Sequence, residues 1–280
     1  MDNDDNALAF CYSWYLDSFC MWDAIVLDDY CGAIALPTRR KFGLKQVYQP
    51  NFIQKCIWFG KTLNNDDEKQ VRNIILNHYS LTTINTNILT SDSHKRTNLI
   101  ISLSSNIDRL RGSYSKSLRK NLNRISSDLE LTSVSEPIRT ISLYRQQWGA
   151  LNPQLINENY NTLSHLIKER PENFKCVEVT SDGELLAAII LLRGKNRFHY
   201  ILGASSESGK KENALSLALD HIILSYAESD FIFDFEGSSI PSVKSFYESF
   251  GAIDEPFYEI TLNSKVGAFI KSVYNRLSKS

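Results

Sequence analysis

Apolar residues between positions 231 and 260 follow first a strand spacing, then a helix spacing, and then a strand spacing again. Residues 231–235 form an apolar, aromatic run of strand length, with Asp234 and Glu236 at its C-terminal end. The next apolar positions recur every three or four residues up to Gly251, as in a short helix: Val243, Phe246, Tyr247 and Phe250. Residues 257–262 have the composition of another strand. This pattern predicts a strand–helix–strand unit with two carboxylates at a strand end.

The order of the predicted elements is similar in the two halves of the chain. Residues 22–52 and 174–206 each hold three apolar runs separated by an acidic turn and a basic turn, which predicts two antiparallel meanders. A helical stretch and a later strand follow each meander, at 67–79 and 99–105 and at 213–226 and 258–264. Repeats of this length indicate duplicated domains. We therefore expect a mixed α/β fold of two tandem domains, 1–128 and 129–280, without the regular alternation of a doubly wound fold.

Composition narrows the class of protein. The 280 residues are 42% hydrophobic and 22% charged, and the formal net charge of −1 gives no overall field that would recruit DNA or a membrane. The five cysteines form no CxxC pair, which favours buried thiols in a reducing compartment. The acidic start MDNDDN is unlike a signal peptide, and the longest apolar run, 185–192, is too short to span a membrane. We expect a cytoplasmic protein.

Three segments together resemble the GNAT acyltransferase superfamily. Residues 247–252, YESFGA, are similar to that family's closing motif, in which a helical Tyr precedes a Gly and a final strand. The doubled arrangement resembles the FemAB-like transferases, and residues 113–124 and 233–243 resemble their basic helix and late strand with the helix after it. The resemblance implies two tandem GNAT-like domains, an N-acyltransferase activity, acyl-CoA as co-substrate and no permanently bound cofactor. The family's Arg/Gln-x-x-Gly-x-Gly/Ala turn is replaced by GKKENA at 209–214.

Residues 203–213, GASSESGKKEN, join a predicted strand to a predicted helix start. Backbone N–H groups at such a junction favour phosphate, and two lysines add positive charge. The candidate residues for donor binding are Gly203, Ala204, Ser205, Ser208, Gly209, Lys210, Lys211 and Asn213. A solvated turn is the alternative.

Three residues are candidates for catalysis. The resemblance places Tyr247 where GNAT enzymes protonate the leaving thiolate, and a phenol has a proton to donate there; core packing is the alternative. Asp234 and Glu236 lie two residues apart and so share a strand face, where either carboxylate could deprotonate an amine or hold a cationic acceptor. The sequence does not distinguish them, and capping of the next helix is the alternative.

Substrate contacts are expected elsewhere. Trp22, Tyr48 and Gln49 lie at the ends of the first meander, where they could line an acceptor cleft between domains. Arg119 belongs to a basic stretch, 94–124, of net charge +7. An acidic stretch at 228–259 has the opposite net charge, −7. A solvated face, docking of the two halves, and binding of an anionic donor or lipid are all compatible with this pattern.

The resemblance, together with these candidate residues, implies transfer of an acyl or aminoacyl group from a phosphate-bearing small-molecule donor to an amine. The alternatives are an aminoacyl-tRNA-dependent ligase and a non-catalytic binding protein on the same fold. The histidines form no HExxH or other dense ligand pattern, so no metal site is expected. The absence of GxSxG and GxGxxG disfavours a hydrolase or a dinucleotide-binding oxidoreductase.

Overall fold

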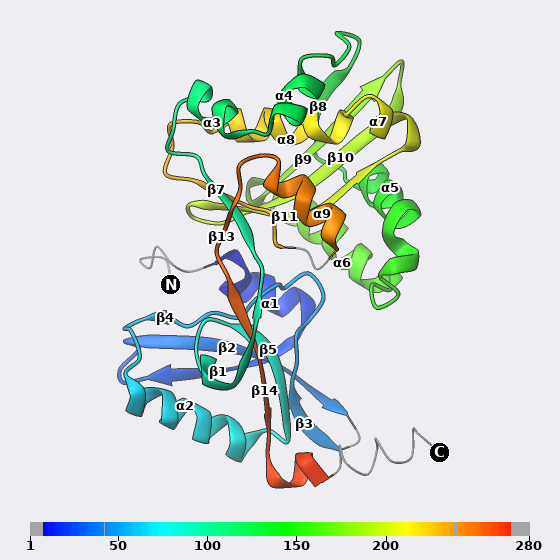
Figure 1. The fold of residues 1–280 in the computed structure, drawn as a ribbon. Coiled ribbons are helices and arrows are strands. Elements are labelled where there is room, and N and C mark those ends of the chain that lie inside the picture. Colours follow the sequence, from blue (N-terminus) through cyan, green and yellow to red (C-terminus); the bar gives the residue numbers. More distant parts are fainter. Residues whose placement is uncertain (1–7, 42, 238–239, 270–280) are drawn as a thin grey trace. The chain divides into compact units, whose positions relative to one another are not determined.

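The computed structural model describes residues 8–41, 43–237 and 240–269. Contacts divide the chain into two compact units. Unit 1 consists of Met1–Arg96 with Pro256–Ser280, and unit 2 consists of Thr97–Glu255. Each unit has its own sheet and its own hydrophobic core (Figure 1).

Unit 1 is built on a sheet in the order β1-β2-β3-β5-β14-β6, with β4 paired to β2. Strands β1, β2 and β3 form the first antiparallel meander, as predicted. The strands are β1 (Met21–Leu27), β2 (Gly32–Lys41), β3 (Leu44–Val47), β4 (Phe59–Gly60), β5 (Leu81–Thr86), β6 (Ser93–Arg96) and β14 (Phe257–Asn263). The helices are η1 (Ala9–Cys11), α1 (Ser13–Phe19), α2 (Asn65–His78) and η2 (Thr90–Asp92).

Helix α2 illustrates how local sequence fixes an element of unit 1. The Asn64 side chain accepts hydrogen bonds from the backbone N–H groups of Asp66 and Asp67, at 2.8 and 2.9 Å. The Asp67 carboxylate accepts in turn from the Asn64 N–H at 3.1 Å, which completes a capping box. Val71 and Ile75, four residues apart, are buried in the core of unit 1.

Unit 2 has a sheet in the order β13-β7-β12-β11-β10-β9-β8. Strands β9, β10 and β11 form the second predicted meander, and β12 pairs parallel to β11. Figure 1 shows α3, α4 and α8 on one face of this sheet and α5 and α6 on the other. The strands are β7 (Leu99–Ser102), β8 (Glu130–Val134), β9 (Phe174–Ser181), β10 (Glu184–Arg193), β11 (Arg197–Ser205), β12 (Ile232–Asp234) and β13 (Ile253–Asp254). The helices are α3 (Ile107–Ser113), α4 (Lys116–Leu122), α5 (Ile138–Trp148), η3 (Gly149–Leu151), α6 (Asn157–Glu169), η4 (Pro171–Asn173), α7 (Glu207–Lys211), α8 (Ala214–Ser225) and α9 (Pro241–Glu248).

The two units do not coincide with the predicted division into 1–128 and 129–280. Strand β7, from the first half of the sequence, pairs with β12 and β13 in unit 2, and helices α3 and α4 follow it there. Strand β14, from the second half, pairs with β5 and β6 in unit 1. The halves therefore exchange strands. Such pairings join positions more than 100 residues apart, so the local apolar pattern cannot predict them.

Candidate functional site

The candidate site lies where β11 and β12 separate. The two strands pair through only three residues each, from Arg197 with Ile232 to His199 with Asp234, whereas β11 continues to Ser205. After β12 the chain turns sharply, because Glu236 and Gly237 both have left-handed backbones with φ of 62° and 67°. Such a conformation costs a non-glycine residue about 1–3 kcal/mol, and it is typical of functional sites.

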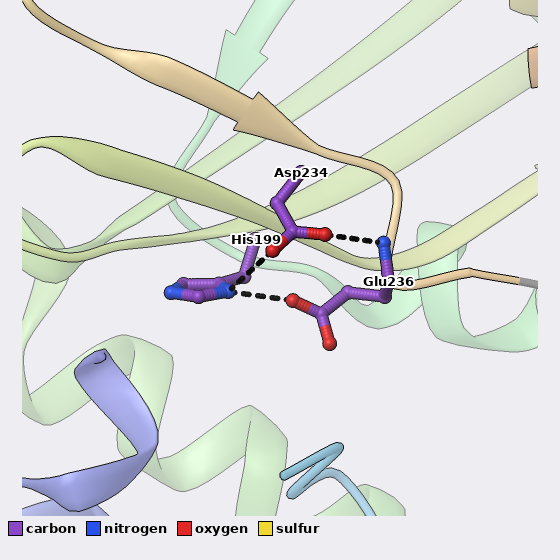
Figure 2. Close-up of side chains that lie close together, drawn as sticks. All are labelled: His199, Asp234 and Glu236. Atoms are coloured by element: carbon purple, nitrogen blue, oxygen red, sulfur yellow. Dashed lines mark hydrogen bonds and ion pairs between the residues drawn. The ribbon is translucent and has the colours of Figure 1, made fainter. Parts of the chain in front are cut away.

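Three side chains converge at this turn (Figure 2). Nδ1 of His199 lies 2.5 Å from Oε1 of Glu236 and 3.9 Å from Oδ2 of Asp234. The backbone N–H of Glu236 donates to Oδ1 of Asp234 at 2.9 Å, which helps to hold the left-handed residue in place. The predicted pair of carboxylates is therefore brought together on one histidine.

A buried arginine neutralises Asp234. Nη1 of Arg197 donates to Oδ2 of Asp234 and to Oε2 of Glu255, each at 2.7 Å, and Nη2 donates to Oε1 of Glu255 at 2.9 Å. The pKa of Arg197 is raised: burial alone would lower it, but the hydrogen bonds and charges of Glu255 and Asp234 outweigh burial. Arg197 stays charged at any working pH.

The structure separates the roles of the two predicted acids. The Asp234 side chain is fully buried (0% exposed) and is engaged by Arg197 and by the backbone of Glu236. The Glu236 side chain retains 14% exposure while it contacts His199. Glu236 is therefore the more exposed of the two carboxylates, and Asp234 holds the backbone of Glu236.

Within the described residues, His199, Asp234 and Glu236 form the group whose ligand atoms could approach a metal ion, since these atoms lie within 4.8 Å of one another. Two features oppose a cation there. Arg197 already places a positive charge 2.7 Å from Asp234. The 2.5 Å separation of His199 Nδ1 and Glu236 Oε1 is that of a hydrogen bond, which a metal ion between them would have to displace. The geometry fits proton transfer better than metal binding.

Tyr247 on α9 faces the same region. Its ring stacks on Phe235, with centroids 4.5 Å apart, and meets the edge of Tyr200 at 6.0 Å. Burial raises the pKa of Tyr247 above its ordinary value, and the neighbouring Tyr144 and Glu236 raise it further. The phenol is therefore protonated through the physiological range, close to Glu236. Gly251 ends the helical turn with φ of 76°, as predicted. Ser238 and Ser239, either of which could cap this helix by its place in the sequence, lie outside the described residues.

Most candidate donor-binding residues between 203 and 213 have local structural partners. Ser205 is buried and its hydroxyl donates to the Leu186 carbonyl at 3.1 Å, while Lys210 pairs with Glu207 at 2.5 Å. A Cβ on Gly209 would lie 1.9 Å from the Leu186 carbonyl oxygen, so this glycine allows close packing of α7 on β10. Gly203 and Ala204 belong to β11, Asn213 occupies the N-cap position of α8 with φ of 55°, and Ser208 and Lys211 are exposed. Their role in binding phosphate stays a prediction.

The candidate substrate residues fall in both units. In unit 1, Trp22 donates through Nε1 to Asp17 at 2.7 Å, and Arg39 lies 4.6 Å above the Tyr48 ring. Gln49 bridges Ile53 and the Asn85 backbone. The predicted acceptor cleft formed by these residues stays a prediction.

Arg119, the fourth substrate candidate, is exposed on α4 in unit 2 and donates to the Gly112 carbonyl at 3.3 Å. The basic stretch that contains Arg119 also meets the acidic stretch 228–259 within unit 2. They meet through backbone pairing of β7 with β12 and through the Ser115 N–H, which donates to the Ser249 carbonyl at 2.7 Å.

Sequence reasoning missed Arg197 and His199. Neither has neighbours along the chain that suggest chemistry, because their partners lie 35 or more residues away, on β12 and beyond it. The pairing of the strand at 197–205 with the strand at 231–235 would have placed His199 beside Asp234. The apolar pattern did not predict that the chain crosses through α8 so that β12 pairs parallel to β11.

No helix in the described part of the chain is both long and apolar enough to cross a membrane.

Comparison with known proteins supports the resemblance seen in the sequence. Residues 109–239 match the family described as "Acetyltransferase (GNAT) domain". No curated protein sequence matches the chain. The crystal structure of FemX superposes with a TM-score of 0.67 at 10% identity, covering 93% of this chain and 94% of FemX. A conserved protein of unknown function from Bacteroides thetaiotaomicron superposes with a TM-score of 0.58 at 13% identity, covering 93% of each chain.

A third structure has the same fold: the C-terminal domain of a proposed lysylphosphatidylglycerol synthetase from Agrobacterium fabrum. It superposes with a TM-score of 0.54 at 14% identity, covering 89% of this chain and 86% of that chain. At these identities the likeness establishes the fold. The expected mixed α/β class and the FemAB-like arrangement are confirmed: residues 109–239 match the GNAT acetyltransferase domain family, and the two-sheet fold is similar to that of FemX.

Proposed function

We propose that this protein transfers an acyl or aminoacyl group to an amine at the turn after β12. The observation that carries the proposal is the contact of Glu236 with His199, 2.5 Å long, beside Tyr247 in a GNAT domain. A carboxylate joined to an imidazole supplies a base, and a protonated phenol supplies an acid. This is the pairing that acyl transfer to an amine requires.

The proposed reaction proceeds by attack of the amine on the acyl carbonyl. The neutral amine nitrogen bonds to the carbonyl carbon, and the Glu236–His199 pair takes the proton that this nitrogen loses as the bond forms. The bond from that carbon to the leaving sulfur or oxygen breaks, and the leaving group takes the Tyr247 proton. Solvent later removes the proton from the base and restores the one on Tyr247. Positioning of both reactants lowers the barrier further, because it removes the entropic cost of their encounter.

Two donor classes fit this reaction: a thioester such as acyl-CoA, and an oxygen ester such as the aminoacyl-tRNA that the FemAB resemblance implies. The raised pKa of Tyr247 favours the second, since a phenol less acidic than usual protonates a thiolate, with a thiol pKa of about 8.5, only uphill. An alkoxide is a stronger base and matches such a phenol. The local partners of Ser205 and Gly209 also favour a donor other than acyl-CoA. Steep loss of activity with salt would mark a tRNA donor.

The test compares Glu236→Gln with Glu248→Gln in assays of acetyl-CoA and aminoacyl-tRNA with amine acceptors. Loss of a general base typically costs about a hundredfold or more, so we expect that loss in Glu236→Gln. Glu248 is exposed on α9 and pairs with Lys244, so its substitution controls for charge and should leave the rate within about twofold. Ligand binding without turnover by the wild-type protein would instead support the non-catalytic alternative.

A further inference from the structure

Beyond His199, the edge of β11 that faces away from β10 has no partner strand among the described residues. The Ser206 N–H donates to the Leu186 carbonyl of β10 at 2.8 Å. Because successive residues in a strand direct their backbone groups to opposite edges, those of Gly203 and Ser205 point away from β10. An open edge of this kind can receive an extended ligand that carries amide groups, as an added strand.

Two consecutive side chains of α5 occupy this edge. Oε1 of Gln147 accepts from the Ser205 N–H at 2.7 Å, and Nε1 of Trp148 donates to the Gly203 carbonyl at 3.2 Å. The Ser205 N–H and the Gly203 carbonyl are the backbone donor and acceptor that an added amide chain would use. Both side chains are half-buried, so they form part of the packing of α5 on the sheet.

The opposite end of α5 is fixed to the neighbouring strands. Arg139 pairs with the buried Glu178 of β9 at 3.5 Å and donates to the Gly183 carbonyl at 3.2 Å. Thr140 donates to Glu178 at 3.3 Å. Helix α5 is therefore held at both ends. A shift of the whole helix away from β11 would break its contacts with Glu178 and Gly183 as well as those of Gln147 and Trp148.

We propose that Gln147 and Trp148 are specificity-determining residues that close the β11 edge to extended, amide-bearing donor arms. This inference rests on the proposed transfer function and adds to it that the donor delivers its acyl group to the amine beside Glu236 without lying along β11. The excluded class includes pantetheine thioesters, whose arm carries two amides. The class admitted is an acyl ester without an amide-bearing arm, such as the oxygen ester of an aminoacyl-tRNA.

The test is calorimetric titration of CoA into the wild-type protein and into Gln147→Ala, Trp148→Phe and their combination. Phenylalanine retains most of the ring but removes the N–H that Gly203 accepts. We expect no saturable binding by the wild type at millimolar CoA, and at least about tenfold tighter binding by the double variant, because two backbone hydrogen bonds become available to the ligand. Gln146→Ala, exposed and adjacent on α5, is the matched control and should behave like the wild type.

Micromolar binding of CoA by the wild type would overturn the inference, and so would a folded double variant that gains no affinity. Thermal melts establish folding, and the single variants provide milder substitutions if the double variant unfolds. The titration requires no turnover, so it separates this inference from the proposed function. Gain of CoA binding without transfer from any donor would count against the function alone, and CoA-dependent transfer by the wild type would count against the inference alone.

Discussion

Replacement of Arg197 by methionine tests whether the buried charge network holds the site together. The Arg197 side chain is 12% exposed and Asp234 is 0% exposed, so Arg197→Met leaves a carboxylate buried without its cation. Breaking a buried pair on one side costs about 3–5 kcal/mol. The Glu255 side chain is 39% exposed, so water can solvate this second carboxylate, and the loss of its ion pair adds little to the cost in stability. We expect the free energy of unfolding to fall by about 3–5 kcal/mol.

Urea unfolding of Arg197→Met, Asp234→Asn and the double variant measures this effect. Asp234→Asn leaves Arg197 paired with Glu255 and should cost about 1–3 kcal/mol, the value of a charge-assisted hydrogen bond. The double variant should be more stable than Arg197→Met alone, because no unpaired charge stays buried. Arg124→Met, on an exposed arginine, should change stability by less than about 0.5 kcal/mol. A loss below about 1 kcal/mol in Arg197→Met, or a double variant less stable than that single variant, would refute the reasoning.

Two further predictions concern residues first identified as ligand-binding or catalytic. Gly209→Ala should lower the free energy of unfolding by about 1–3 kcal/mol in urea, because its Cβ would meet the Leu186 carbonyl oxygen at 1.9 Å; unchanged stability with weakened donor binding would instead make Gly209 a ligand contact. The raised pKa of Tyr247 means that folding stability is fully present below pH of about 10 and falls as pH rises above it, since the unfolded phenol ionises first. Tyr247→Phe should therefore reduce the alkaline loss by up to about 1.4 kcal/mol per pH unit, measured by urea unfolding between pH 9 and 11, and an unchanged slope would contradict the assignment.

The elements of this fold were largely predictable because each buries a regular apolar pattern. The two meanders, the helices later identified as α2 and α8, and the strand at 257–262 all follow from spacing and end signals in short windows. The grouping of elements into units was not predictable in this way. The apolar pattern predicts β7 and β14 equally as strands, and only their distant partners decide to which sheet each belongs.

The candidate site was predicted in part for the same physical reason. Asp234 and Glu236 lie two residues apart, so their proximity is a property of the backbone and visible in the sequence. Arg197 and His199 enter through the parallel pairing of β11 with β12. The phosphate-binding expectation at 203–213 relied on residue types that also serve packing and capping, and glycine, serine and lysine do not reveal which of these roles they serve.

The distribution of burial between the two acids bears on why both are present. A carboxylate must be reachable to accept a proton from a substrate, yet a reachable carboxylate on a left-handed turn is difficult to hold still. Asp234 resolves this conflict, because it accepts the Glu236 N–H at 2.9 Å while Arg197 compensates its own buried charge. The strained turn, the ion pair and the histidine contact thus depend on one another. Loss of Arg197 should therefore loosen Glu236 and reduce the rate of transfer even where the protein stays folded.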